Sequence, residues 1–555
     1  MSFKHTIIVI AALSVMLFST TIQRDFWYPD EPDMAEITRL MLRSGDWIRL
    51  QLYNGTFADY PPLFFWAAAA MGRLFGLSEV ALRLPTLMSA VALLVISALF
   101  AKRRFGERTA FWSVVVLGTA TQFVWQAVNM HVDMLFALLI AASLFCYDHV
   151  RSTGSRRARL LLLCGTGLLS GLAALTKGPA GIVLPFAIIA ADHLLHKEYR
   201  SLRRLLVIGA AGVGVFCIWA AIYAAQAGQS NLIYFIFRQN ISRFLTGFSH
   251  LQPWYYYITN VWIDLAPWSI FLVFAIPFAW KASRKGDRSV AFVLLWLAVI
   301  FIFFNLSRSK RQVYLLPLYP AAAMLMGHLI ADLTARATAR EVRIFRAALL
   351  PIACAFAGIG CVLPLFLSNL RTRFPESHGI SIPIVLLSLT CLAGGAAMIV
   401  WLCRRHAVQA LYTMPIVSAA MCVIGLGWFC PLLDQSISAK EPAHWLASQI
   451  KLGEVLACLR PFPVLHNESS VLSFYGGFPV EVITDDEDIS NYAARHPGHI
   501  LLIEDKDMPW ALDGFSSRML IVREMHIGRN HFLAVRLSPG VNNRRRGLIR
   551  LPKKL

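Results

Sequence analysis

The sequence predicts an all-α polytopic membrane protein that ends in a small α/β domain. Hydrophobic residues make up 57% of the 555-residue chain and charged residues only 15%, whereas a soluble protein carries about 25% charged residues. The apolar residues are gathered in stretches long enough to cross a bilayer. Hydrophobicity falls after Cys430, and the rest of the chain alternates helical and strand-like patterns. Together these observations define the fold class.

The membrane part is predicted from stretches of roughly 17–25 apolar residues, each of which can cross a bilayer. We expect about thirteen transmembrane helices, near 6–22, 80–101, 109–128, 132–149, 159–176, 180–195, 204–226, 263–280, 289–305, 313–333, 346–368, 382–403 and 411–430. The stretch 61–76 is short and begins with proline. It is therefore predicted to lie in the membrane interface.

The charges predict the orientation. Every second loop between the expected spans is rich in Lys and Arg, and such loops face the cytoplasm. The N-terminus is then inside, while residues 23–79, 226–262 and the chain after 431 lie outside. The net charge of +20 is thus interpreted as topology, and nucleic acid is not expected as a partner. The first span lacks a small-residue cleavage signal after it, so it is predicted to be retained.

The chain divides into a membrane domain at 1–431, a periplasmic α/β domain at 432–540 and a basic tail at 541–555. Within the second domain we expect a helix at 439–450. Short strand-like runs lie at 463–466, 471–475, 480–484, 499–504, 519–522 and 531–537. This domain has no glycine-rich phosphate loop and no Cys/His metal spacing. It is expected to cover the outer mouth of the membrane domain or to help hold an acceptor.

Carboxylates are concentrated in the first outer loop, which contains Asp30, Glu31 and, further on, Asp59. Charged groups beside a bilayer are costly and usually functional. A short outer turn places another carboxylate, Asp133, at the mouth of a span. These residues are the candidates for acid–base chemistry.

Cations also occur on the predicted outer side, against the positive-inside trend, which indicates an anionic ligand. The candidates are Lys177, Arg243, Arg308 and Lys310. Lys and Arg attract a phosphodiester, and Arg can bind phosphate with two hydrogen bonds. An enzyme that breaks a sugar–phosphate bond must stabilise charge on the departing phosphate, and a carboxylate can accept a proton from an acceptor hydroxyl. A divalent metal (Zn or Mg) held by Asp59 and His250 could share this task. No nucleotide cofactor is expected.

Each candidate has a simpler interpretation. Asp30 could only cap a helix that begins near Pro32, and Asp133 could only pair with a nearby cation. Lys177 could extend its ammonium from a span end to the interface. His250 could be a satisfied interfacial histidine. The sequence alone leaves these alternatives open.

Several blocks in this order resemble the polyprenyl-phosphate-sugar-dependent glycosyltransferases of the GT-C group, which includes protein O-mannosyltransferases and the aminoarabinose transferase that modifies lipid A. The blocks are Tyr28-Pro29-Asp30-Glu31, Asp59-Tyr60-Pro61-Pro62, Lys177-Gly178-Pro179, Pro253-Trp254-Tyr255-Tyr256 after His250, and Tyr314 to Pro320 after Lys310. The resemblance covers most of the membrane domain.

The resemblance implies a role for each block. Asp30 matches the family's essential carboxylate, with Glu31 beside it, and Asp133 matches a supporting carboxylate. Lys177, Arg243, Arg308 and Lys310 are expected to hold the donor phosphate, and Tyr60 and Tyr314 to line the substrate pocket. Two departures each remove a cation. Asp33 stands where aminoarabinose transferases usually have Arg, and Asp59-Tyr60 stands where they tend to have Glu-Lys.

The predicted function is transfer of a sugar, with inversion, from a polyprenyl (undecaprenyl) phosphate carrier to a cell-envelope acceptor at the outer face of the bacterial inner membrane. The expected acceptor is lipid A, so the pathway would be lipid A and lipopolysaccharide biosynthesis. Protein O-glycosylation is an alternative. A transporter or lipid flippase is another, but the repeated halves with broken helices that are typical of transporters are not found in the sequence.

Overall fold

The computed structural model describes two compact units. The first comprises Met1–Arg24, Ile37–Gln51 and Gly55–Leu432, and the second Asp25–Glu36, Leu52–Asn54 and Leu433–Leu555. Within them the structure describes residues 2–27, 29–52, 55–336, 339–375, 377–450, 455–459, 465–483, 495–496, 498–505, 519–527 and 530–537. Each unit is described by itself.

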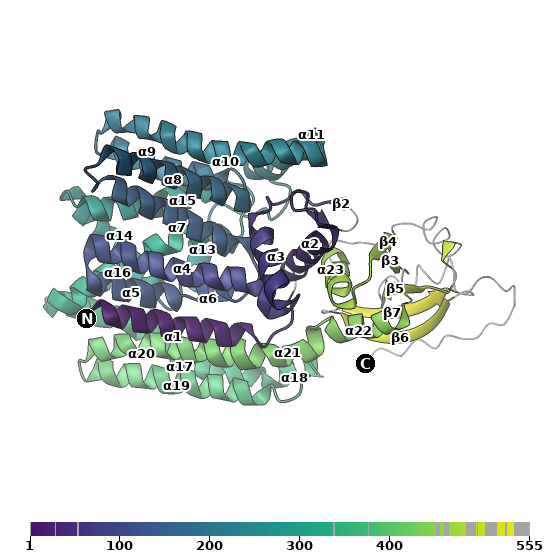
Figure 1. Ribbon diagram of the computed structural model, residues 1–555. Coiled ribbons are helices and arrows are strands. Elements are labelled where there is room, and N and C mark those ends of the chain that lie inside the picture. Colours follow the sequence, from purple (N-terminus) through teal and green to yellow (C-terminus); the bar gives the residue numbers. More distant parts are fainter. Residues whose placement is uncertain are drawn as a thin grey trace. The chain divides into compact units, whose positions relative to one another are not determined.

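The first unit is a multi-pass membrane domain of long helices that run side by side (Figure 1). Its N-terminal half contains α1 (Phe3–Thr21), α3 (Leu63–Phe75), α4 (Glu79–Phe105), α5 (Glu107–Gly118), α6 (Thr121–Ala127), α7 (Val132–Val150), α8 (Arg156–Lys177), α9 (Ala180–Leu195) and α10 (Arg204–Ala227). Its C-terminal half contains α13 (Tyr256–Asp264), α14 (Ser269–Arg284), α15 (Arg288–Leu306), α16 (Tyr319–Arg336), α17 (Ala339–Val362), α19 (Ser381–Cys403) and α20 (Ala407–Ile424).

Helices occupy all thirteen predicted spans. Among the described residues, ten are long and apolar enough to cross a membrane. The other three predicted spans are irregular: 109–128 is divided between α5 and α6, α9 has only 16 residues, and α13 and α14 meet at an angle of 114°. The 13-residue α3 extends over ~20 Å, less than the ~30 Å hydrocarbon core. Its length therefore agrees with the predicted interfacial position.

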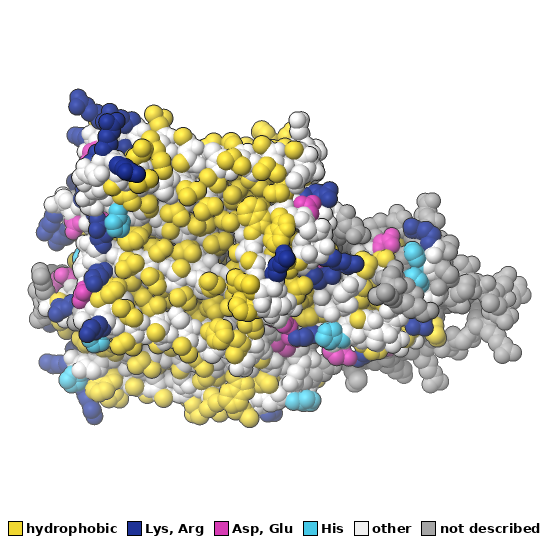
Figure 2. Space-filling view, viewed as in Figure 1, with side chains coloured by type: hydrophobic (Ala, Val, Ile, Leu, Met, Phe, Trp, Pro, Cys, Tyr) yellow, Lys and Arg dark blue, Asp and Glu magenta, His cyan; other side chains and the backbone are white. Residues whose placement is uncertain are grey.

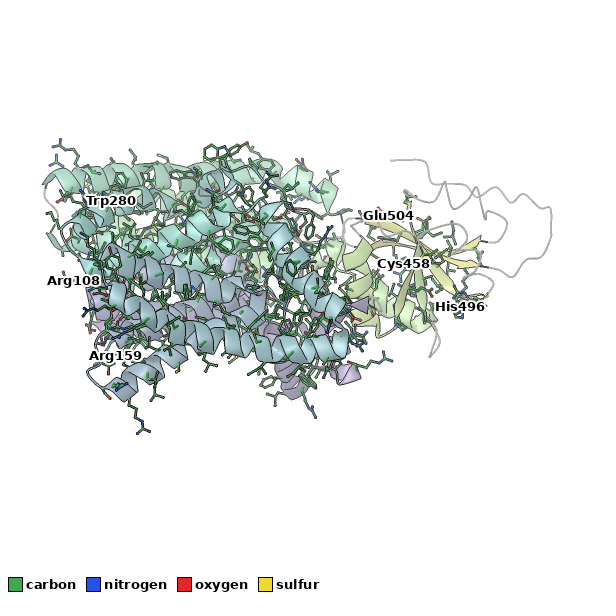
Figure 3. The ribbon with its side chains drawn as sticks, turned by 90° about the horizontal axis from the view of Figure 1, so that it is seen from above. Arg108, Arg159, Trp280, Cys458, His496 and Glu504 are labelled. Carbon is green, nitrogen blue, oxygen red and sulfur yellow. The ribbon has the colours of Figure 1, made fainter. Side chains whose placement is uncertain are left out.

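Apolar and basic side chains occupy different parts of the surface of the first unit. On the face drawn in Figure 2, an apolar band crosses the helices, with Lys and Arg gathered beyond it at the end where the chain begins. Arg108, Arg159 and Trp280 lie at this same end (Figure 3). A Trp beside cations at the edge of an apolar belt is typical of a membrane–water interface.

The second unit contains a five-stranded sheet with the strand order β4-β3-β5-β7-β6. The elements are α22 (Lys440–Gln449), β3 (Leu456–Leu459), α23 (Leu465–Gly476), β4 (Val480–Ile483), β5 (Ile500–Glu504), β6 (Met519–Ile527) and β7 (Asn530–Leu537). β3 pairs in parallel with β4 and β5, whereas β7 is antiparallel to β5 and β6. Both helices contribute to the core of this unit.

One predicted strand is wrong: residues 471–475 belong to helix α23. Val471 and Leu472 are buried in the core of the unit, whereas Ser470 and Ser473 donate hydrogen bonds to carboxylates. Residues one turn apart share a helix face, so this polar and apolar spacing suits a helix. Strand β3 was not expected. Of the predicted strand 463–466, residues 465 and 466 are described, and they form the start of helix α23, so this strand is also wrong there. The predicted tail 541–555 lies outside the described residues.

Candidate functional site

The N-terminus of α7 and the C-terminus of α8 meet at a buried ion pair. Asp133, in the first turn of α7, accepts a hydrogen bond from the ammonium of Lys177, the last residue of α8. Nδ1 of His131 lies 2.7 Å from the other Asp133 oxygen. The Asp133 side chain is 1% exposed and that of Lys177 12% exposed. Asp133 is therefore paired with a nearby cation, as its simpler interpretation predicted.

The chain reverses direction directly after Lys177. Gly178 ends α8 with φ of 95°, a conformation that L side chains rarely adopt, and its amide donates to the Ala174 carbonyl. The Lys177 ammonium lies 4.2 Å from the centre of the Tyr314 ring. This contact is a cation–π interaction, so Lys177 has both a carboxylate and an aromatic partner.

Lys177 lines a cavity of about 390 Å³ in the first unit. Three other polar residues predicted for the site, Tyr60, Arg243 and Tyr314, line the same cavity. Most of the wall is apolar and includes Phe136, Val183, Ile236, Phe303 and Phe304. The cavity thus combines two cations with an apolar lining, which suits a phosphate attached to a hydrocarbon chain.

Asp59 also lines this cavity, where it is linked to Arg243 through an amide. Gln239 donates from Nε2 to Asp59 Oδ1 at 2.5 Å, and Gln239 Oε1 accepts from Arg243 Nη1 at 3.3 Å. Burial raises the pKa of Asp59, and the nearby Arg243 opposes this increase. Gln239 and Arg243 lie in and directly after the π-helix Tyr234–Ser242, an irregular segment of a kind often found at functional sites.

Arg308 and Lys310 lie in the loop after α15 but do not appear in the cavity wall. Arg308 is exposed, and its amide donates to the Phe244 carbonyl at 3.1 Å. Lys310 is buried, and its ammonium donates to the Ser307 carbonyl. Their proposed contact with phosphate stays a prediction.

The predicted metal ligands do not form a recognisable cation site. Asp59 is hydrogen bonded to Gln239, and the His250 carbonyl accepts from the Lys310 amide at 3.0 Å. Within the described ranges, no three His, Cys, Asp or Glu residues are grouped so that they could hold a metal ion. No step of the mechanism is therefore assigned to a metal, and its presence stays a prediction that chelation before a transfer assay would test.

Asp30 and Glu31 lie in the second unit, at the start of α2 (Glu31–Ser44). The Asp30 carbonyl accepts from the Met34 amide at 3.2 Å, so Asp30 occupies the position where a cap is expected. Glu31 is buried, and its carboxylate accepts from the Trp27 amide at 2.9 Å. The helix thus begins one residue before Pro32, which agrees with the predicted start near Pro32.

Two further carboxylates of the first outer loop, Asp33 and Glu36, contact the C-terminal part of their own unit. Ser470 donates to Asp33 at 2.5 Å, and Ser473 donates to Glu36 at 2.9 Å. This use of the acidic residues was not predicted. Nor were Gln239 and His131, the partners of Asp59 and Asp133. A buried amide and an imidazole at the end of a helix give no distinctive sequence signal.

Comparison with known proteins agrees with this fold. Residues 2–238 match the family described as dolichyl-phosphate-mannose-protein mannosyltransferase. The crystal structure of ArnT from Cupriavidus metallidurans bound to undecaprenyl phosphate has a TM-score of 0.77 and 21% identity, and the match covers 95% of this chain and 97% of that chain. For the archaeal oligosaccharyltransferase AglB from Archaeoglobus fulgidus the TM-score is 0.53 and the identity 11%, over 91% of this chain and 70% of that one.

Sequence relatives point in the same direction. An undecaprenyl phosphate-alpha-4-amino-4-deoxy-L-arabinose arabinosyl transferase from Pseudomonas aeruginosa is 29% identical over 306 residues, which are 54% of this chain and 55% of the relative. A protein of the same name from Pectobacterium atrosepticum is 27% identical over 65% of this chain and 66% of the relative. The chain thus spans little more than half the length of the first relative. The fold is that of the ArnT crystal structure. The family match covers residues 2–238, and the alignments to these two relatives cover 54% and 65% of the chain. Over these parts the chain is similar to protein mannosyltransferases and to aminoarabinose transferases.

Proposed function

We propose that this protein transfers a sugar from undecaprenyl phosphate to lipid A at the outer face of the inner membrane. The observation that carries the proposal is the cavity in which Lys177 and Arg243 stand beside an apolar wall. A polyprenyl-phosphate sugar has the same combination of an anionic phosphate and a long hydrocarbon chain. The names of the sequence relatives support this choice of donor.

The cations and the apolar side chains of the cavity have different roles in this mechanism. Lys177 and Arg243 bind the donor phosphate and stabilise the charge that builds on it as the bond to the sugar breaks. Asp133 holds the Lys177 ammonium in place through their ion pair. The apolar side chains Phe136 and Phe304 line the path of the polyprenyl chain.

Asp30 acts on the acceptor in this proposal. If the acceptor group is a hydroxyl, Asp30 takes its proton. If the acceptor is a phosphate, as on lipid A, no deprotonation is needed. Asp30 then orients the acceptor or stabilises positive charge on the sugar, and attack from the face opposite the departing phosphate inverts the anomeric carbon.

A transfer assay with purified full-length protein tests the proposal. Labelled undecaprenyl-phosphate aminoarabinose is supplied with lipid A or with a Ser/Thr peptide. Label on lipid A is the expected result. Label on the peptide would favour a protein acceptor, which the match of residues 2–238 to the protein mannosyltransferase family also supports. Movement of the donor across a vesicle membrane without transfer would instead indicate a flippase.

The proposed orientation places the cavity on the periplasmic side. It is supported by the basic end of the first unit (Figure 2), because Lys and Arg collect on the cytoplasmic side. Cysteine labelling in cells tests it. Gly55→Cys should react with an impermeant reagent from the periplasm and Lys285→Cys should not. The reverse pattern would overturn the orientation.

A further inference from the structure

A second group of charged residues lies at the end of the first unit opposite the cavity. Five cations from three helices and one loop meet four carboxylates there. The cations are Arg103, Arg104, Arg151, Arg204 and Arg288, and the carboxylates are Asp148, Asp192, Glu198 and Asp287. Helix α7 has 19 residues between this end and the cavity end, so the two sites are ~28 Å apart along it. The proposed function does not use this cluster.

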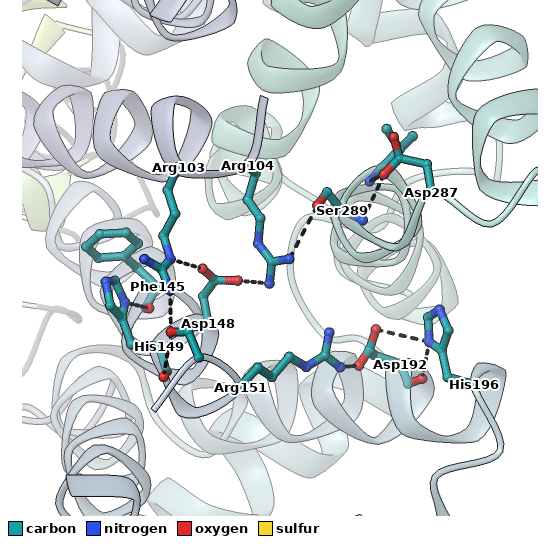
Figure 4. Close-up of polar contacts among 12 residues, drawn as sticks. Arg103, Arg104, Phe145, Asp148, His149, Arg151, Asp192, His196, Asp287 and Ser289 are labelled. Carbon is teal, nitrogen blue, oxygen red and sulfur yellow. Dashed lines mark hydrogen bonds and ion pairs between the residues drawn. The ribbon is translucent and has the colours of Figure 1, made fainter. Parts of the chain in front are cut away.

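The carboxylates of the cluster are already engaged (Figure 4). Asp148 accepts from Nε of Arg103 at 2.9 Å and also from Arg104. Arg151 pairs with Asp192, which also faces His196 at 3.4 Å. Each of these carboxylates is thus shared between two partners.

The other two carboxylates of the cluster, Glu198 and Asp287, also have two partners each. Glu198 contacts Arg288 at 2.6 Å and His193 at 3.0 Å. Asp287 accepts from the amides of Ser289 and Val290 and so caps α15. With five arginines and four carboxylates, the cluster keeps one more cation than carboxylates.

Arg151 has a hydrogen-bond donor that no carboxylate of the cluster accepts. Its Nη1 is buried and has no hydrogen-bond partner within the part of the chain that the structure describes. Figure 4 shows this nitrogen directed away from Asp192, on the side where Arg104 lies. Arg104 is near enough for the two charges to repel each other. Burying a guanidinium nitrogen without an acceptor is unfavourable, so the arrangement favours an anion between these arginines.

We propose that this cluster binds the phosphate of an anionic membrane lipid. Arginine pairs well with phosphate because its planar guanidinium donates two parallel hydrogen bonds. Large apolar side chains stand exposed in the same segments as the charges, namely Leu194, Leu195, Tyr199 and Leu206, which are 52%, 55%, 61% and 74% exposed. They offer a surface for acyl chains, which a free phosphate ion does not have. Basic sites between helices on the cytoplasmic side bind lipid headgroups in this way.

Native mass spectrometry of the full-length protein in detergent tests the proposal. Phosphatidylglycerol is compared with diacylglycerol of the same acyl chains and with inorganic phosphate. The expected result is retention of phosphatidylglycerol alone. Arg151→Gln should weaken this binding by about 10- to 100-fold, because one charged hydrogen bond is lost. Arg157→Gln makes the same charge change at an exposed position of the same end and should bind normally.

Three results would overturn the proposal. Equal retention of diacylglycerol would mean that the acyl chains alone bind, and equal retention of inorganic phosphate would remove the lipid as the source. Unchanged phosphatidylglycerol binding in Arg151→Gln would place the lipid elsewhere. If that variant does not fold, Arg288→Gln applies the same test, because Arg288 is 37% exposed in its ion pair. Undecaprenyl-phosphate binding at the opposite end should be normal in each folded variant.

Discussion

Replacing Lys177 by methionine separates its two roles in the cavity. Methionine keeps much of the length and packing of the lysine stem but removes the ammonium. In the native protein this ammonium is bound to Asp133 and lies 4.2 Å from the Tyr314 ring centre. Lys177→Met therefore breaks a buried ion pair and, in our proposal, also removes a ligand of the donor phosphate.

The expected loss of stability follows from burial. The two side chains are 12% and 1% exposed, so the pair belongs with buried pairs, for which loss of one partner costs roughly 3–5 kcal/mol. His131 remains 2.7 Å from Asp133, and we therefore expect the lower end, about 3 kcal/mol. In the double variant Asp133→Leu/Lys177→Met no charge is left unpaired, and most of the stability should return.

The double variant should regain stability but should not regain affinity for the donor. Loss of one charged hydrogen bond to phosphate reduces affinity by about 10- to 150-fold, and the double variant should show the same loss. Calorimetric titration with undecaprenyl phosphate measures affinity, and thermal unfolding in detergent measures stability. Lys281→Met, at an exposed position of the opposite end, is the control. A double variant that binds undecaprenyl phosphate as tightly as wild type would refute a role of Lys177 in donor binding.

Three further predictions follow from single residues. Asp30→Asn should keep its unfolding midpoint, because Asn caps as well as Asp, while transfer falls by roughly 10²–10⁴-fold; a near wild-type rate would leave capping as the only role. Burial raises the pKa of Asp59, so its protonated form is favoured in the folded state and stability is lost as pH rises through that raised pKa. Asp59→Asn should therefore unfold at a higher temperature than wild type at neutral pH, and the difference should close below pH ~3.9; a difference that does not change with pH would contradict this. Gly178→Ala should destabilise by more than about 1 kcal/mol, because φ is 95° and the new Cβ would lie 2.6 Å from Oδ1 of Asn240. Gly214→Ala in α10, with no atom within 4 Å, is its control and should not destabilise.

Much of the fold could be predicted because the bilayer imposes a simple rule on the chain. A membrane span needs a long apolar stretch, and such stretches are visible without knowledge of their neighbours. A wrong assignment fell in the second unit, at 471–475. There the pattern Val-Leu-Ser-Phe-Tyr suits a strand by composition. However, its Ser473 binds Glu36, and Ser470 just before it binds Asp33, both more than 400 residues earlier in the chain. A contact over that separation leaves no local signal.

The sequence by itself determined the membrane class, the family resemblance and most of the residues that could carry charge chemistry. Only the tertiary structure decided which of them meet. It joined Lys177 to Asp133 and placed Tyr60, Arg243 and Tyr314 around one cavity, but left Arg308 and Lys310 out of its wall. It also inserted Gln239 between Asp59 and Arg243. The physical reason is that local composition shows which groups are costly to bury, whereas their partners come from other helices and are set by packing.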